Sequence, residues 1–195
     1  MEPRRQPPVA ILAGGAARRM GAPKASALLD GRPLLAHALA AVAAAGLRAV
    51  VLAKDNTPLP PLACERWPEP QEPRHPLVAV AAALRRADGP LVTLPVDLPR
   101  VAPGLLRALA ERPEPLVVVE AAGRLHPLLG RFSPAHADAL AAAAREGAPV
   151  TRTVLALGAV RLGDDEVARH GDPAALLANV NRPADLAALE RDDRG

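Results

Sequence analysis

Aromatic side chains are scarce in this chain, and their scarcity excludes one class of function. Only 1% of the 195 residues are aromatic, namely Trp67 and Phe132, and tyrosine is absent. Proteins that bind single-stranded nucleic acid stack the bases on aromatic rings, which this chain cannot do. The net charge of +3 comes from arginines scattered among acidic residues rather than from a basic block. We therefore expect no nucleic-acid partner.

Cysteine and long apolar runs are also scarce. The single cysteine, Cys64, cannot form an internal disulfide, and no Cys/His spacing typical of a metal site surrounds it. We interpret it as a buried or loop thiol rather than a nucleophile. No stretch of about 18 residues is free of charges and prolines, and no apolar segment typical of a secretory signal opens the chain. These absences predict a cytoplasmic protein with no membrane span.

Lysine is nearly absent as well, so the positions of the few lysines are informative. Of the 24 basic residues only Lys24 and Lys54 are lysines. Lys24 closes a glycine-rich basic stretch, residues 12–24, which reads LAGGAARRMGAPK. A compact ammonium suits a point contact with phosphate, and the planar guanidinium of arginine does not replace it freely. A modest positive charge also fits a small anionic substrate.

The stretch at 12–24 follows an apolar segment, residues 9–13, that we predict to be a buried strand. Glycines let the backbone approach an anion closely and expose its N–H groups, so Gly14 and Gly15 are candidate phosphate contacts. The spacing matches neither the Walker A motif nor the dinucleotide-binding fingerprint. From residue types alone, the stretch predicts either an anion site or an ordinary glycine turn.

Short apolar segments alternate with helical patterns along most of the chain. Strands are predicted at residues 9–13, 48–53, 90–95, 115–120, 125–132 and 159–162. Helices are predicted at 33–45, 77–86, 103–111, 133–146, 148–157 and from Pro183 onwards. Proline-rich residues 55–75 are predicted to form one long loop. The alternation favours a three-layer α/β/α fold with a mostly parallel sheet.

The expected organisation is a single domain at residues 9–190, between tails at 1–8 and 191–195. In such folds ligands bind at the carboxyl ends of the strands. Asp97 follows a predicted strand at this edge. A carboxylate there suits Mg²⁺, which takes one or two carboxylates together with phosphate oxygens and water. An aspartate that caps a helix or closes a turn is the other interpretation.

Four motifs, in the same order, resemble those of the molybdenum cofactor guanylyltransferase family of Rossmann-like nucleotidyltransferases. They are LAGGAARRMGAPK at 12–24, GRPLLAH at 31–37, VDLP at 96–99 and NVNRPADL at 179–186. The segment RLHPL at 124–128 also resembles an internal His-Pro segment of that family. The resemblance extends from about residue 9 to 190. The four motifs identify the nucleotidyltransferase superfamily more specifically than they identify the substrate.

The resemblance implies that GMP is transferred from GTP to the terminal phosphate of the molybdenum-molybdopterin cofactor, with release of pyrophosphate. It implies that the nucleotide contacts are Leu12, Ala13, Gly14, Gly15, Lys24 and Asp97. It implies that the catalytic residues are Arg19, Lys24 and Asp97, with Arg18 as a helper. It further implies that Asp97 and Asn181 bind Mg²⁺, that Asn179 supports them, and that a molybdoenzyme or other cofactor-pathway proteins are partners.

Several positions depart from the family pattern. Pro23 precedes Lys24 where aspartate is common, and Ala53-Lys54-Asp55 stands where the family's second strand often ends in Asn-x-Asn. HPLVA at 75–79 replaces Gly-Pro-Leu-x-Gly. The expected loop carboxylate has three candidates, which are Glu65, Glu69 and Glu72.

These departures leave other functions open. The alternatives are CTP with the same cofactor, another small phosphate acceptor, or a non-catalytic nucleotide-binding homologue. We interpret His37 as a structural residue of its helix. For His126 two roles stay open, facing the site or packing in the core, and no partner is evident for the other histidines.

Overall fold

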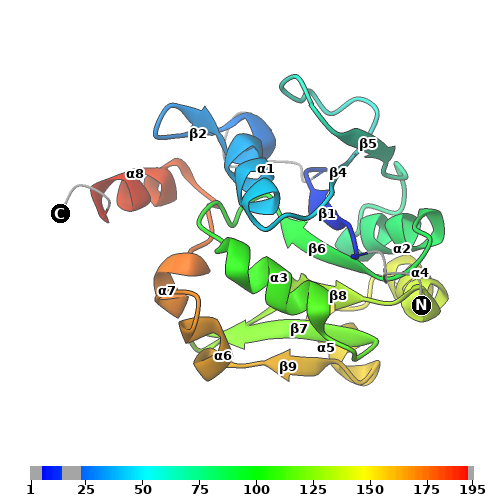
Figure 1. The fold of residues 1–195 in the computed structure, drawn as a ribbon. Helices are drawn as coiled ribbons and strands as arrows, with labels where there is room; N and C mark the ends of the chain where they lie inside the picture. The colour runs from blue at the N-terminus through cyan, green and yellow to red at the C-terminus, as the bar shows by residue number, and fades with distance from the viewer. Residues whose placement is uncertain (1–5, 15–22, 193–195) are drawn as a thin grey trace.

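A seven-stranded sheet forms the centre of the computed structural model, which describes residues 6–14 and 23–192 (Figure 1). The strand order is β5-β4-β1-β6-β8-β7-β9. In chain order its strands are β1 (Val9–Leu12), β4 (Ala49–Ala53), β5 (Glu65–Pro68), β6 (Leu91–Pro95), β7 (Leu116–Ala121), β8 (Arg124–Phe132) and β9 (Val160–Leu162). A separate hairpin pairs β2 (Leu28–Leu29) with β3 (Arg32–Pro33).

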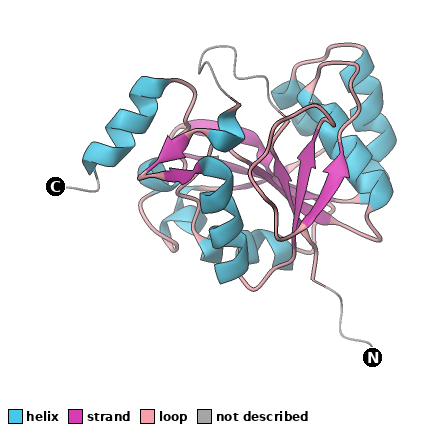
Figure 2. Cartoon of the chain, turned by 90° about the horizontal axis from the view of Figure 1, so that it is seen from above, coloured by secondary structure: helices cyan, strands magenta, loops and turns pink. Residues whose placement is uncertain are grey.

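Helices lie on both sides of the sheet (Figure 2). The α-helices are α1 (Leu34–Ala44), α2 (Pro76–Arg86), α3 (Pro103–Glu111), α4 (Ala137–Arg145), α5 (Val150–Ala156), α6 (Asp164–Ala168), α7 (Pro173–Leu176) and α8 (Pro183–Asp192). Two short 3-10 helices are η1 (Lys24–Ser26) and η2 (Pro134–His136). The three-layer α/β/α arrangement confirms the predicted fold class.

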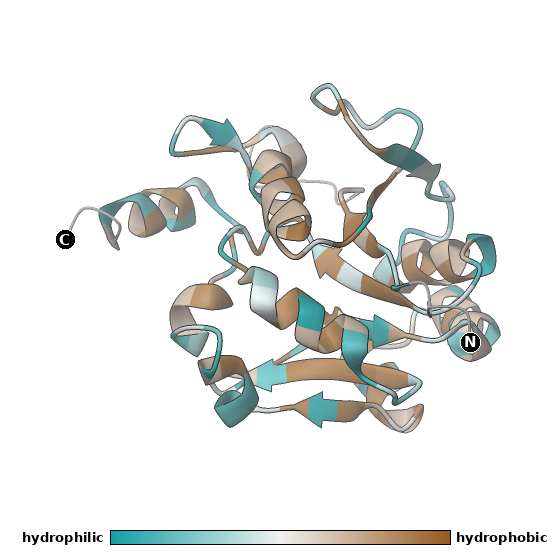
Figure 3. Ribbon diagram, in the orientation of Figure 1, coloured by the Kyte–Doolittle hydropathy of each residue, from teal (hydrophilic) through white to brown (hydrophobic). Residues whose placement is uncertain are grey.

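Successive residues of each strand enter two different cores, because side chains alternate across a sheet. In β1, Val9 and Ile11 join one core, whereas Ala10 joins the other. The first core is completed by α1 and α3, and the second by α2, α4 and α5. The inner strand β7 is accordingly mostly brown in Figure 3, whereas the edge strand β5 is mostly teal. Burial on both faces explains the near-continuous apolar runs.

The sheet departs from parallel pairing at β8, which is antiparallel to both of its neighbours, β6 and β7. A two-residue turn, Ala122-Gly123, joins β7 to β8 with φ angles of 53° and 68°. Both residues therefore lie in the left-handed region that a tight hairpin turn requires. The strand at 125–132 was expected, and this turn determines its direction.

The prediction of one long loop over residues 55–75 is wrong. Residues 65–68 form β5, a parallel edge strand in register with β4, with Val50 opposite Glu65 and Ala53 opposite Pro68. Its inward side chain, Trp67, is only 4% exposed and packs in the second core. The strand is short and ends in proline, which is tolerated at a sheet edge. Glu69, directly after it, is thereby placed at the carboxyl edge of the sheet.

Smaller differences concern connections. The predicted helix at 133–146 is divided into η2 and α4, and α6 and α7 were not expected. The β2–β3 hairpin turns at Asp30-Gly31, whose φ angles are 50° and 72°; aspartate-glycine is a strong signal for such a turn. Across residues 6–14 and 23–192, no helix combines the length and apolar character needed to cross a membrane.

Candidate active site

The predicted nucleotide residues that the structure describes lie at one edge of the sheet. The parallel strands β1, β4, β5 and β6 end there, followed by Ala13, Lys54, Glu69 and Val96-Asp97. The Ala13 N–H donates to the Leu52 carbonyl at 2.9 Å, and the Val96 N–H donates to that of Leu12 at 3.3 Å. The carboxyl ends of neighbouring strands are thus held side by side, as expected for a ligand site in this fold.

Lys24 lies at the centre of this edge and joins two residues distant in sequence. Its Nζ donates hydrogen bonds to Asp97 Oδ2 at 2.8 Å and to Asn181 Oδ1 at 2.7 Å. The Lys24 and Asp97 side chains are 19% and 20% exposed. The helix η1 starts at Lys24 and packs against α1. The three side chains thus present an ammonium, a carboxylate and an amide at one point.

Asn181 is held in place by hydrogen bonds on both sides of it. The Val180 N–H donates to the Asp97 carbonyl at 2.9 Å, which ties this segment to the end of β6. The Asp185 carboxylate accepts from the N–H groups of Asn181 and Arg182 at 2.7 and 2.8 Å. An acidic residue in the first turn of α8 satisfies donors that the helix cannot pair itself. The fold thus positions the Asn181 amide beside Asp97.

Glu69 forms a second cluster with Gly14 and Lys54. A Cβ atom on Gly14 would lie 1.7 Å from Glu69 Oε2, so the carboxylate packs directly on the glycine backbone. Lys54 Nζ lies 3.9 Å from Glu69 Oε1 and donates to the Gln71 carbonyl at 2.7 Å. Burial raises the pKa of Glu69, and the charge of Lys54 opposes this shift. This pair places a carboxylate and an ammonium beside the first glycine of the loop.

A family model described as the MobA-like NTP transferase domain matches residues 9–166. The chain belongs to this family of nucleotidyltransferases. A relative from Cereibacter sphaeroides, named molybdenum cofactor guanylyltransferase, is 37% identical over 194 residues, which cover 92% of this chain and 93% of the relative. A probable molybdenum cofactor guanylyltransferase from Deinococcus radiodurans is 34% identical over 197 residues, 92% of each chain. The family resemblance expected from the motifs is therefore confirmed.

Solved structures agree on the fold. Molybdopterin-guanine dinucleotide biosynthesis protein A from Archaeoglobus fulgidus matches 95% of this chain and 98% of its own, with a TM-score of 0.81 and 22% identity. The 2-C-methyl-D-erythritol 4-phosphate cytidylyltransferase from Thermus thermophilus matches 97% and 100%, with a TM-score of 0.65 and 24% identity. These two likenesses show a Rossmann-like fold. The family model and the curated relatives show that this MobA-like chain is an enzyme of the nucleotidyltransferase class.

Among the predicted site residues of this MobA-like enzyme, the structure brings together Lys24, Asp97 and Asn181. It places Leu12, Ala13 and Gly14 at the end of β1. Gly15, Arg18 and Arg19 lie outside the described residues. Asn179 lies on the segment that leads to Asn181 and is half-buried.

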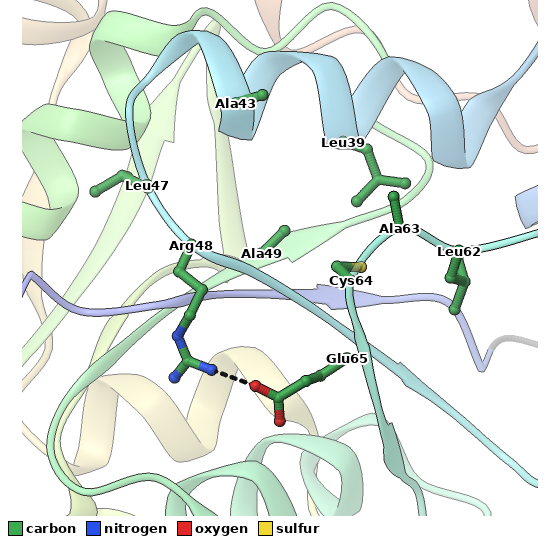
Figure 4. A pocket seen from close by; sticks show the side chains of 9 residues that line it. All are labelled: Leu39, Ala43, Leu47, Arg48, Ala49, Leu62, Ala63, Cys64 and Glu65. Atoms are coloured by element: carbon green, nitrogen blue, oxygen red, sulfur yellow. Dashed lines mark hydrogen bonds and ion pairs between the residues drawn. The ribbon is translucent and has the colours of Figure 1, made fainter.

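Of the three candidate loop carboxylates, only Glu69 reaches this edge. Glu72 is exposed and pairs with Arg74 at 3.1 Å. Glu65 lies at the start of β5, at the other end of the strand, where it pairs with Arg48 at 2.8 Å (Figure 4). The choice among the three follows from β5, which sequence reasoning missed. The signal that could have found Glu69 is Trp67, the only large apolar residue close before it.

Glu65 and Arg48 border an apolar pocket of about 870 Å³ between α1 and the starts of β4 and β5 (Figure 4). Cys64 also lines this pocket and is half-buried. Burial raises the pKa of the Cys64 thiol, as does the neighbouring Glu65 charge. The thiol is therefore less nucleophilic than an ordinary cysteine. This agrees with its interpretation as a structural thiol.

His37 has the structural role expected of it, since its Nε2 lies 2.9 Å from the Leu29 carbonyl and links α1 to the β2–β3 hairpin. His75 caps α2, where its Nδ1 accepts from the Leu77 N–H at 3.3 Å. Its Nε2 lies 3.0 Å from the Ala148 carbonyl. His75 thus has a partner that the sequence did not reveal.

His126 is buried on β8, with 6% of its surface exposed. Burial lowers the pKa of His126, the charge of Arg124 adds to this effect, and the charge of Asp97 opposes it. The imidazole thus lies within electrostatic range of Asp97. The burial expected of a core residue therefore applies to His126, and whether it acts in the site stays a prediction.

The oxygen atoms of Asp97 and Asn181 fit a divalent cation in their chemistry. Both accept hydrogen bonds from the same ammonium, so a single cation can reach both. In the described part of the chain, no group of three or more His, Cys, Asp or Glu side chains is placed so that it could hold a metal ion. The protein would therefore supply one carboxylate and one amide oxygen, and substrate phosphates and water would complete the set, as is usual for Mg²⁺.

Proposed function

We propose that this enzyme transfers GMP from GTP to the phosphate of a molybdenum-molybdopterin cofactor and releases pyrophosphate. The observation that carries the proposal is the contact of Lys24 Nζ with both Asp97 and Asn181, directly after the glycine-rich stretch. The names of the relatives, at up to 37% identity, support the choice of nucleotide and acceptor.

In the proposed reaction, an oxygen of the acceptor phosphate attacks the α-phosphorus of GTP in line. A new P–O bond forms to the α-phosphorus, and the bond to the oxygen that bridges the α- and β-phosphorus breaks. The bridging oxygen leaves with the electron pair as part of pyrophosphate. The acceptor needs no strong base, because a phosphate monoester is mostly anionic near neutral pH. Positioning and neutralisation of charge would supply the rate enhancement.

Lys24 would leave its contacts with Asp97 and Asn181 and neutralise phosphate charge when the triphosphate binds. Asp97 and Asn181 would then be available to hold Mg²⁺. When bound, this ion would supply positive charge to the phosphate oxygens as a Lewis acid. The backbone N–H groups near Gly14 and Gly15 would hold the nucleotide. Arg19 would add a further positive charge.

Glu69 and Lys54 support guanine as the base. The two oxygens of a carboxylate match two adjacent N–H donors, which guanine offers at N1 and N2. The ammonium of Lys54 is a donor that matches the O6 acceptor of guanine. Cytosine offers only one donor group on its corresponding edge. This pair is therefore our candidate for the residues that select the base.

The proposal is tested by steady-state assays of pyrophosphate release with purified protein, Mg²⁺ and molybdopterin-type acceptor. GTP, CTP, ATP and UTP are compared, and the dinucleotide product is identified by mass spectrometry. We expect the highest kcat/KM with GTP and loss of activity when a chelator removes the divalent cation. Higher kcat/KM with CTP would establish the cytidylyl alternative, and nucleotide binding without pyrophosphate release would establish the non-catalytic one.

Two variants test the selection of the nucleotide base separately from the transfer reaction. Glu69→Gln and Lys54→Met should reduce the preference for GTP over CTP by roughly tenfold, because each loses a hydrogen bond to the base. The matched control is Glu72→Gln, an exposed carboxylate on the same stretch that pairs with Arg74. Equal preference in wild-type and both variants would remove Glu69 and Lys54 from the base site.

A further inference from the structure

Two basic side chains on β8, Arg124 and His126, have no assigned role. His126 is more than nine-tenths buried and has no hydrogen-bond partner among residues 6–14 and 23–192. Arg124 is exposed and, over the same residues, has no ion pair.

The pairing of β6 with β8 brings these side chains to the catalytic edge. Thr93 of β6 pairs with Gly130 of β8, and the two strands are antiparallel. Asp97 lies four residues after Thr93, and His126 lies four residues before Gly130, so both extend toward the same end of the sheet. The electrostatic coupling between His126 and Asp97 agrees with this arrangement.

Arg124 and His126 share one face of the sheet. Arg124 pairs with Ala121 of β7, and His126 pairs with Val119 of β7. Both β7 residues belong to the core under α1 and α3. Directly opposed residues of antiparallel strands have side chains on the same face. Val180, next to Asn181, belongs to the same core. The two basic side chains therefore lie on the side of the sheet from which Asn181 approaches Asp97.

An irregularity of β8 sets the position of His126. The register with β7 changes from Val118 opposite Gly130 to Val119 opposite His126, so residues 127–129 are extra on the β8 side. Thr93 Oγ1 donates to the Leu128 carbonyl at 2.7 Å and holds this bulge against β6. Such bulges redirect neighbouring side chains and are frequent beside active sites. Here the bulge separates His126 from regular pairing with β6.

The strand order divides the site into two halves. The glycine-rich stretch, Lys54 and Glu69 follow β1, β4 and β5, which all lie on one side of β6. β8 is the neighbour of β6 on the other side. In-line transfer needs the acceptor and the leaving pyrophosphate on opposite sides of the reacting phosphorus. If the nucleotide lies over β1 and β4, the acceptor must reach Asp97 from the side of β8.

We infer that Arg124 and His126 bind the phosphate of the acceptor, an assignment that rests on the proposed nucleotidyl transfer. Arginine presents a planar pair of donors that matches two phosphate oxygens. A histidine N–H supplies a further donor from a fixed position beside Asp97. Together they would hold a dianionic phosphate next to a carboxylate that would otherwise repel it.

The test is steady-state kinetics with GTP and molybdopterin-type acceptor varied in turn. Arg124→Ala and His126→Leu should raise the KM for the acceptor by about tenfold to a hundredfold, the loss of a charge-assisted hydrogen bond. The KM and the dissociation constant for GTP should be unchanged. Arg124→Lys and His126→Gln, which retain a donor, should recover part of the loss. The matched control is Arg152→Ala, an exposed arginine on α5, on the other face of the sheet.

The possible outcomes separate this inference from the proposed function. If wild-type protein transfers GMP and the variants retain its acceptor KM, the acceptor site is wrong and the function stands. If His126→Leu and His126→Gln raise both KM values equally and lower thermal stability equally, His126 is a packing residue and the inference fails for it. If wild-type protein has no transferase activity, the proposed function and this inference both fail.

Discussion

Lys24 and Asp97 lie 73 positions apart in sequence, yet Lys24 Nζ donates to Asp97 Oδ2 at 2.8 Å. This contact joins the end of the glycine-rich stretch to the end of β6. The ammonium occupies the point between Asp97 and Asn181 at which a divalent cation would reach both oxygens. Lys24 thus neutralises the carboxylate and keeps the two oxygens close together.

Removal of either member of this pair should abolish most turnover without unfolding the protein. Lys24→Ala and Asp97→Ala should each lower kcat by about a hundredfold to a thousandfold, because each removes a charge that acts on the transition state. Circular dichroism and thermal melts should show the same fold, since both side chains are partly exposed.

Lys24→Arg provides a matched control for the ammonium. It retains the charge, but its planar guanidinium cannot replace a point contact, so we expect at most partial activity. Near-wild-type transfer by purified Asp97→Ala would refute the assignment of Asp97 to the metal.

The position of Asn181 should depend on Asp185. Asp185→Ala removes the acceptor for two backbone N–H groups and should cost about 1 kcal/mol of stability, the usual effect of a lost helix cap. It should also lower kcat, because the Asn181 amide is then held less firmly beside Asp97. Urea denaturation and steady-state assays measure the two effects.

Asp172→Ala is the control for a lost cap, since Asp172 caps α7 through the Ala175 N–H at 3.0 Å. Within the described residues, Asp172 forms no hydrogen bond or ion pair with a site residue. It should reduce stability by a similar amount and leave kcat unchanged. A reduction of kcat in the Asp172 variant equal to that in Asp185→Ala would show that helix stability, not Asn181, determines the activity.

Glu69 should make the protein less stable at neutral pH. Burial raises the pKa of Glu69 above its ordinary value of 4.5. Between that value and the raised one, the folded protein binds more protons than the unfolded chain, so stability falls as the pH rises through this window. Glu69→Gln should therefore raise the midpoint of thermal unfolding at pH 7, and the gain should shrink as the pH falls toward 4.5.

Glu72→Gln, on the exposed part of the same stretch, should leave the midpoint of unfolding nearly unchanged at both pH values. A lower midpoint for Glu69→Gln at pH 7 would mean that attraction by Lys54 exceeds the cost of burying Glu69, contrary to the raised pKa.

His37 should contribute to stability and not to catalysis. Its hydrogen bond with the Leu29 carbonyl ties α1 to the β2–β3 hairpin. His37→Ala should therefore cost about 1 kcal/mol in the free energy of unfolding, the typical value for one such bond. The KM for GTP and kcat should remain within twofold of wild-type. Loss of activity in a fully folded His37→Ala protein would contradict the structural role.

Local patterns predicted most of the secondary structure, because apolar segments and glycine or proline boundaries act over a few residues. They failed at β5, where four residues with a single large apolar side chain, Trp67, give almost no periodic signal. They also could not give the direction of β8, which depends on the φ angles of Ala122 and Gly123. An alanine in a left-handed turn has no clear sequence signature.

The chain by itself determined the α/β class, the family and the residue types of the site, since these follow from periodicity and from motifs that are continuous in sequence. It also determined that Lys24, Asp97 and Asn181 are the candidates for phosphate and metal chemistry. Only the tertiary structure decided which carboxylate joins Gly14, that Lys24 bridges the two expected metal ligands, and that His126 lies near Asp97. Each of these depends on which strands are neighbours and on the burial of charge, and strand order is a long-range property that no local segment encodes.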